Sequence, residues 1–275
     1  MTPLDKRIGF IQGRLSPVVD NKIQAFPGTH WREEFSSARE IDISLMEWTI
    51  DTQSFLENPL ISEGACEEIL NLCEKFEISI PSVTCDYYME NPHWVNGQAD
   101  IQRDLNTIID GMERIKSTIL VIPLVDNSSI KRNSGIDLSF FIEFEKRLIE
   151  TGIKFAFEVD LDIQSTRDFI DLFPPGCFGI NYDIGNSASE GFNTEIEIHE
   201  YGDRVINVHV KDRFLKGTTV PLGLGNANIP ASIRALKKAN YRGNFMLQTA
   251  RARSNNHADE LIRNIDFLIK ANSNA

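Results

Sequence analysis

Six polar residues stand toward the ends of short apolar runs of the sequence, and their types suit a metal site. They are Glu47, Glu158, Asp183, His209, Lys211 and Gln248. Two carboxylates, an imidazole and an amide oxygen can surround a divalent cation, and this mixed donor set is typical of Mn, Mg, Co or Zn rather than of a thiolate site. Two carboxylates buried together without a cation would repel each other and lose their hydration. The sequence therefore predicts a divalent metal ion as cofactor.

The apolar runs that lead to these residues are predicted strands. They recur eight times, at 7–13, 42–48, 78–85, 118–125, 154–160, 178–185, 205–212 and 244–250. Segments with helical spacing lie between them, at about 31–40, 62–77, 98–116, 137–151, 164–173, 194–202, 230–240 and 257–271. Parallel strands need crossovers, and eight of them can close into a ring without an exposed edge. We therefore predict an α/β fold, a (β/α)8 TIM barrel formed by a single domain, residues 1–275.

An open doubly wound sheet is the alternative fold for this pattern. The turn after the first run reads IQGRLSP and lacks the glycine-rich pattern of a dinucleotide site, which favours the barrel. In a barrel the C-terminal ends of all strands meet at one face. The six polar side chains are therefore expected to converge there.

Composition limits the classes of partner. The chain has 275 residues, of which 41% are hydrophobic and 25% charged, and its net charge is -12. Such a charge disfavours nonspecific binding to nucleic acid or to an anionic membrane. No uncharged run approaches the roughly 20 residues of a membrane span, and the four cysteines are scattered. We predict a cytoplasmic protein with reduced cysteines and no nucleic-acid or membrane partner.

Several motifs resemble those of the xylose isomerase-like TIM-barrel superfamily, the sugar phosphate isomerase/epimerase group. They are FEVD, YDIGN, HVKDR followed by PLGLGN, and FMLQTA. The resemblance implies a divalent metal held by Glu158, Asp183, His209 and the residue at position 248, and it implies that Lys211 binds substrate. Barrels of this group commonly pair, so the resemblance also allows a homo-oligomer.

One position departs from the pattern of the ketose epimerases that the sequence resembles. There, glutamates after strands 5 and 8 bind metal and exchange protons with opposite faces of a substrate carbon, whereas this chain has Gln248 at the second position. An amide can offer an oxygen to a cation but cannot accept a proton at neutral pH. We expect Glu158 to transfer the proton and Glu47 to substitute for the missing carboxylate.

Other residues are predicted to bind the substrate. Arg14, Lys211 and Arg213 follow predicted strands of a net acidic chain, which indicates a substrate with a phosphate or carboxylate group. Asn186 stands where the family often has a histidine, and we include it as a substrate ligand. Trp94 lies in a predicted loop at the mouth and can pack on the apolar face of a sugar.

These features predict a metal-dependent isomerase or epimerase of a small sugar or sugar phosphate, with proton transfer through a metal-stabilised enediolate. A dehydratase or lyase of the same superfamily is an alternative because such a reaction needs a single base. A noncatalytic sugar-binding barrel that lost turnover through Gln248 is a second alternative.

Overall fold

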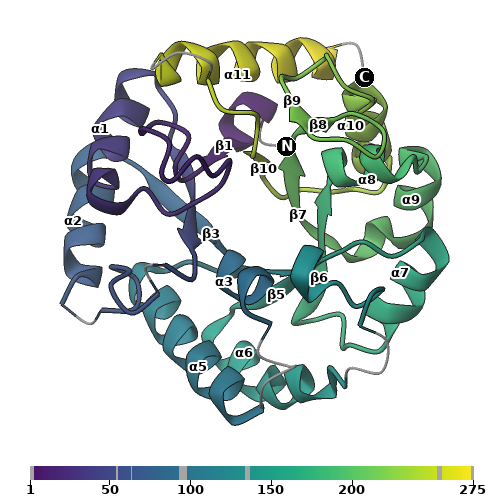
Figure 1. Cartoon of the computed structure of the whole chain (residues 1–275), viewed down its shortest axis with the longest axis horizontal. Coiled ribbons are helices and arrows are strands. Elements are labelled where there is room, and N and C mark those ends of the chain that lie inside the picture. Colours follow the sequence, from purple (N-terminus) through teal and green to yellow (C-terminus); the bar gives the residue numbers. More distant parts are fainter. Residues whose placement is uncertain are drawn as a thin grey trace.

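Eight parallel strands close into a barrel, as predicted (Figure 1). The computed structural model describes residues 3–53, 55–62, 64–92, 98–133, 137–252 and 256–273. The strands follow one another around the ring in the order β1-β10-β7-β6-β5-β4-β3-β2. Their bounds are β1 Ile8–Ile11, β2 Leu45–Ile50, β3 Ser79–Cys85, β4 Ile119–Leu124, β5 Lys154–Val159, β6 Phe178–Asp183, β7 Val205–Val210 and β10 Phe245–Leu247. Because β1 pairs with both β2 and β10, the ring is closed and the open-sheet alternative is excluded.

Helices form an outer ring around the strands (Figure 1). The larger ones are α1 Glu33–Glu40, α2 Cys66–Phe76, α5 Gln98–Ile115, α6 Glu145–Thr151, α7 Ile163–Asp171, α9 Thr194–Tyr201, α10 Ile229–Lys238 and α11 His257–Ser273. None of these helices combines the length and apolar character that crossing a membrane requires, and the same holds for the other helices in the described ranges.

Three short elements at the mouth were not predicted. They are α3 Asp86–Glu90, α8 Ile184–Glu190, and the antiparallel pair β8 Asp212–Arg213 with β9 Thr219–Val220. Helix α8 begins directly after β6, so the stretch predicted as strand through residue 185 turns helical at Ile184. The side chain of Asp183 caps this helix by accepting from the backbone N–H of Asn186 at 2.8 Å.

Aromatic side chains pack between the strands and the outer helices. Phe157 on β5 lies 5.4 Å from Phe169 and 4.9 Å from Phe173, as measured between ring centroids. Phe155 and Phe178 are adjacent at 5.9 Å. Strands covered on both faces must be apolar on their outward side, which explains the continuous hydrophobic runs in the sequence. The inward side of β5, β6 and β7 is different, because it carries the polar residues of the site.

The register of β6 on β7 places these polar residues in layers. Asp183 is paired with His209, and Asn181 is paired with Asn207 one layer below. A register shift between Ile180 and Asn181 separates this alignment from the lower half of the two strands. Side chains two residues apart on a strand point to the same side, so both layers face the barrel interior.

Gly111 allows α5 to pack against the backbone at Leu60. A Cβ atom at residue 111 would overlap the carbonyl oxygen of Leu60, whereas one at Gly176 would meet no atom within 4 Å. We expect Gly111→Ala to lower the free energy of unfolding by about 1–3 kcal/mol through overpacking, although alanine favours a helix by about 1 kcal/mol. Urea denaturation measures this change, with Gly176→Ala as the control. Equal stability of the two variants would contradict the close packing.

Candidate metal and substrate site

A cavity of about 610 Å³ opens at the C-terminal ends of the strands. Its polar lining includes Arg14, Asp86, Glu158, Asp183, Asn186, Lys211, Arg213 and Gln248. These residues come from loops and strand ends that are far apart in sequence. The closed ring therefore places them around one space, as the sequence analysis expected.

Three buried residues form a compact group of metal-ligand type, and two of them, Glu158 and Asp183, line the cavity. One ligand atom each of Glu158, Asp183 and His209 lies within 4.8 Å of those of the other two, and all three residues are buried. They stand at the ends of β5, β6 and β7, which are neighbours in the barrel. The structure thus brings together three of the four residues that the sequence analysis selected as metal ligands, and the fourth, Gln248, lines the same cavity.

Glu158 is fixed by hydrogen bonds to both carboxylate oxygens. Asn186 donates to Oε1 and Asn181 donates to Oε2, each at 2.6 Å. Burial acts to raise the pKa of Glu158, but the hydrogen bond from His209 and the charge of Lys211 outweigh it and lower the pKa. Glu158 is therefore an oriented anion at neutral pH.

Asp183 has a different function for each oxygen. Oδ1 caps α8, while Oδ2 lies 2.7 Å from Lys211 Nζ in an ion pair that lacks good hydrogen-bond geometry. Burial raises the pKa of Asp183, the positive charge of Lys211 lowers it, and the neighbouring Glu158 raises it again, with a net increase. Two carboxylates thus lie side by side with little water around them, which is the conflict that a cation would relieve.

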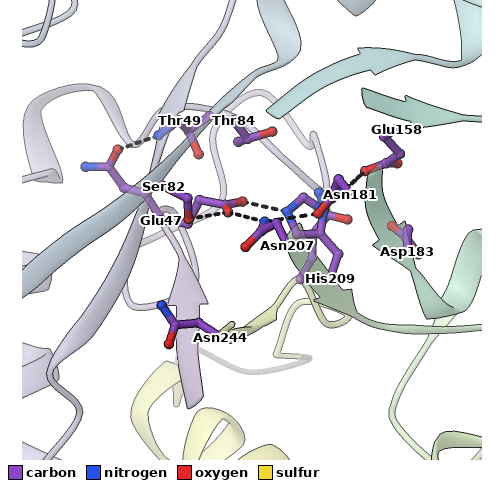
Figure 2. A network of polar contacts seen from close by, with 12 residues as sticks. Glu47, Thr49, Ser82, Thr84, Glu158, Asn181, Asp183, Asn207, His209 and Asn244 are labelled. Atoms are coloured by element: carbon purple, nitrogen blue, oxygen red, sulfur yellow. Dashed lines mark hydrogen bonds and ion pairs between the residues drawn. The ribbon is translucent and has the colours of Figure 1, made fainter. Parts of the chain in front are cut away.

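His209 lies between two carboxylates inside the barrel (Figure 2). Its Nε2 is 2.6 Å from Glu47 Oε1, and its Nδ1 is 3.3 Å from Glu158 Oε2. Burial lowers the pKa of the imidazole, but Glu47 and Glu158 outweigh it and raise the pKa to about 10. The two carboxylates therefore favour the protonated imidazole, and Asn181 Nδ2 lies 3.1 Å from its Nδ1.

Glu47 lies beneath the cavity and is fully buried, and it does not line the cavity. Besides its contact with His209, its Oε2 accepts hydrogen bonds from Ser82 Oγ at 2.6 Å and Asn207 Nδ2 at 3.0 Å (Figure 2). Both oxygens are thus occupied within the barrel. The geometry makes Glu47 a partner that orients His209, and it gives no support to the predicted role in proton transfer.

The cluster fits a divalent cation by its donor chemistry. Two carboxylates and the Nδ1 of His209 face one another, and Nε2 bonds to a carboxylate, as in most metal-binding histidines, where the second ring nitrogen donates outward. Gln248 Oε1 lies at the same end of the barrel and accepts from Lys211 Nζ at 3.0 Å. Lys211 thus holds a positive charge between Asp183 and Gln248.

Several predicted substrate residues form hydrogen bonds within the protein. Arg213 donates through Nη1 to Asn186 Oδ1 at 2.7 Å and through Nε and Nη2 to Gly217 O. Arg14 is buried and donates to Thr249 O and Gln24 Oε1. Burial, together with the nearby guanidinium of Arg251, lowers the pKa of Arg14 to about 9. Trp94 lies outside the described residues.

Asp212 fixes the loop that carries Arg213. It is fully buried, and its carboxylate accepts from the backbone N–H groups of Gly223, Gly225 and Ala227 at 2.9–3.0 Å. A Cβ atom at Gly225 would overlap this carboxylate. The HVKDR and PLGLGN motifs thus form one structural unit, in which the aspartate organises the loop and the glycine makes room for it.

Sequence reasoning missed three polar residues of the site. Asn181 and Asn207 orient Glu158 and Glu47, and each stands two residues before a selected residue, so strand alternation could have identified them. Asp86 follows β3 directly and lines the cavity. The rule that selected Glu158, a carboxylate at a strand end, applies to Asp86 as well, but in the loop after the third strand the sequence analysis selects Trp94.

The fold and the cluster define a TIM barrel with a carboxylate–histidine site at its mouth. The family model described as xylose isomerase-like TIM barrel matches residues 35–271. The chain therefore belongs to this family, which confirms the resemblance seen in the sequence. No curated protein sequence matches the chain.

Solved structures share the fold at low sequence identity. 3-Keto-D-glucoside 4-epimerase from E. coli superposes with a TM-score of 0.65 at 17% identity, over 97% of this chain and 99% of the epimerase. D-allulose 3-epimerase from Methylomonas sp. gives 0.69 at 15%, over 96% and 97%. A xylose isomerase-like TIM barrel protein from Mycobacterium smegmatis, solved in complex with magnesium, gives 0.69 at 15%, over 98% of each chain. These similarities establish the architecture.

Removal of Glu47 would take away the nearer of the two carboxylates that contact His209. We expect Glu47→Ala to lower the free energy of unfolding of the metal-free protein by about 3–5 kcal/mol, the usual cost of breaking a buried ion pair. Chemical denaturation at neutral pH measures the loss. Glu57→Ala, at an exposed glutamate, is the control and should change stability by less than about 0.5 kcal/mol. A small effect of Glu47→Ala would show that the pair is not stabilising.

Proposed function

We propose that the protein is a metal-dependent isomerase or epimerase that acts on a small sugar or sugar phosphate. The observation that carries this proposal is the convergence of Glu158, Asp183 and His209, the first two of which line a cavity of about 610 Å³. Two of the structural neighbours named above are sugar epimerases and a third contains magnesium, which supports the class of reaction and the cofactor.

Glu158, Asp183 and His209 would hold a Mn, Mg, Co or Zn ion, with the side-chain oxygen of Gln248 as a fourth donor. A divalent cation in this position would polarise a substrate carbonyl and the hydroxyl group beside it. Such polarisation acidifies the C–H bond between them. The surrounding residues then determine where the proton goes.

Glu158 is the base in this proposal. Its lowered pKa keeps it ionised, and Asn181 and Asn186 fix both oxygens, so the carboxylate needs little reorganisation to accept a proton. Lys211 lines the cavity beside Asp183 and would donate to substrate oxygens. Arg213 and Asn186 form one hydrogen-bonded pair at the rim and would position a hydroxyl or phosphate group.

The neutral Gln248 argues against an arrangement in which both catalytic bases are also metal ligands. Its Oε1 accepts from Lys211, so the amide is oriented with its oxygen toward the site. Because the amide cannot accept a proton, Glu158 is the ionised side chain that is proposed to accept the substrate proton beside the metal.

Proton exchange with solvent tests the proposed function. Metal-stripped protein is loaded with Mn or Mg and incubated with a panel of ketoses and ketose phosphates in heavy water. We expect deuterium at the carbon next to the carbonyl, detected by NMR and mass spectrometry, and a rate about 10²–10⁴-fold lower in Glu158→Gln, the usual contribution of a general base. Glu113→Gln, at an exposed glutamate on α5, is the control.

Product mass separates the alternatives. Isomerisation and epimerisation conserve the mass of the sugar, whereas a dehydratase would release one water. Sugar binding by the metal-loaded protein with neither exchange nor a change in mass would contradict the proposed function and favour a noncatalytic barrel.

A further inference from the structure

The mouth of the barrel is divided into two unlike halves. Glu158, Asp183, His209 and Gln248 belong to β5, β6, β7 and to the chain just after β10, which are four consecutive strands of the ring. Strand β3 lies opposite β7, which carries His209, and two strands from β5, which carries Glu158. A substrate held by the first half therefore presents its other side to the residues that follow β1, β2, β3 and β4.

Asp86 is the first residue after β3, and it lines the same cavity as the metal-site residues. Its side chain is buried, with 6% of the residue exposed. Oδ1 makes a long contact of 3.4 Å with Thr84 Oγ1, and the buried Oδ2 makes no hydrogen bond. A buried carboxyl oxygen without a partner is costly, which indicates a group that meets a ligand.

Three other carboxylates that line the cavity are engaged by neighbouring residues. Glu190 forms an ion pair with Lys216 at 2.6 Å. Glu197 accepts hydrogen bonds from the hydroxyl groups of Tyr182, Tyr201 and Ser187. Asp160 accepts from Ser129 Oγ at 3.0 Å. Asp86 differs from these three because its buried oxygen is not engaged.

We propose that Asp86 is the second catalytic carboxyl group of this site and that it exchanges a proton with the face of the reacting carbon opposite to Glu158. This inference rests on the proposed function and specifies it as an epimerisation. Asp86 takes the role that Gln248 cannot fill, but it comes from the half of the mouth that would not bind the metal.

The proton transfer balances without any further reactant. The Glu158 carboxylate takes the proton from the carbon next to the carbonyl, and the electron pair of the broken C–H bond stays on the substrate. The protonated Asp86 carboxyl gives its proton to the other face of the same carbon, and the new C–H bond has the inverted configuration. Glu158 is then protonated and Asp86 ionised, and proton exchange with water or the reverse reaction restores both.

The electrostatic surroundings of Asp86 suit a group that both gives and takes a proton. Burial raises its pKa to about 7, and the charge of Glu158 contributes next. The charged and titratable groups that interact with it come from β2, β3, β5, β7, α3 and the chain after β1. They are Glu47, Cys85, Glu158, His209, Glu90 and Arg14. An acid with a pKa near the working pH is effective in both directions of a proton transfer.

Isotope exchange in the Asp86→Asn variant tests this assignment. In heavy water the metal-loaded wild type should form an epimer that carries deuterium at the inverted carbon. Asp86→Asn should lower the rate of epimer formation by about 10²–10⁴-fold, while Glu158 still labels the unconverted sugar. Glu158→Gln should lose both processes, and Asp168→Asn, at an exposed position on α7, should keep both.

Two outcomes would overturn the assignment. Epimer formation at the wild-type rate in Asp86→Asn would show that another group protonates the second face. If Asp86→Asn still binds metal and sugar but loses both labelling and epimer formation, Asp86 supports Glu158 instead. Absence of exchange in the wild type would contradict the proposed function itself.

A second measurement is independent of activity and of metal. When the pKa of a carboxyl group is higher in the folded than in the unfolded state, the folded state binds its proton more tightly. The free energy of unfolding is then highest below the unfolded pKa, and it falls as pH rises toward the folded pKa. With an ordinary pKa of 3.8 and a folded pKa of about 7, the wild type should lose stability relative to Asp86→Asn as pH rises from about 4 to about 7, with little further change above pH 7. An unchanged difference in urea midpoint would contradict a buried, protonated Asp86.

Discussion

The site depends on a histidine that is buried between two carboxylates. Glu47, His209 and Glu158 are all within the barrel, where His209 contacts both carboxylates and the charge of Lys211 acts on Glu158. Burying any one of these groups alone would cost several kcal/mol. Together they hold the Nδ1 of His209 toward Asp183 and Glu158, so the same contacts that satisfy the buried charges also orient a metal ligand.

The neutral polar side chains around these charges explain why the arrangement is rigid. Ser82 and Asn207 bind Glu47, and Asn207 also donates to Asn181, which in turn donates to Glu158. The layer of amides connects β2, β3, β5, β6 and β7 through the barrel interior. A polar network of this kind is favourable only when its members are paired, and its hydrogen bonds then restrict each side chain to one position.

The two halves of the mouth are chemically unequal for a simple topological reason. The proposed metal ligands stand at the ends of β5, β6 and β7 and just after β10. These strands lie next to one another because the chain runs once around the ring and closes. Lys211 lies within this half and contacts both Asp183 and Gln248. A ligand in the cavity therefore meets cationic and metal-binding groups on one side and Asp86 with Arg14 on the other.

Much of this architecture could be predicted from the sequence because it depends on local patterns. Alternating apolar runs and amphipathic segments indicated the barrel, and polar residues at the ends of those runs indicated Glu158, Asp183 and His209. These inferences hold because strand alternation and helix periodicity determine the direction of a side chain from its immediate neighbours. The short helix α8 escaped prediction because its start depends on a cap from Asp183, a residue that the pattern assigned to the strand alone.

Other features depend on contacts between distant residues, and only the tertiary structure could determine them. Glu47 and Glu158 both end apolar runs, yet one is enclosed under His209 and the other lines the cavity, because their surroundings come from different strands. In the sequence, Asp86 cannot be distinguished from other polar residues at the start of a loop. Only the closed ring shows that it lies across from β7. The sequence alone therefore determined which side chains face the barrel axis, whereas packing around the axis decided which of them meet one another and which remain free to meet a ligand.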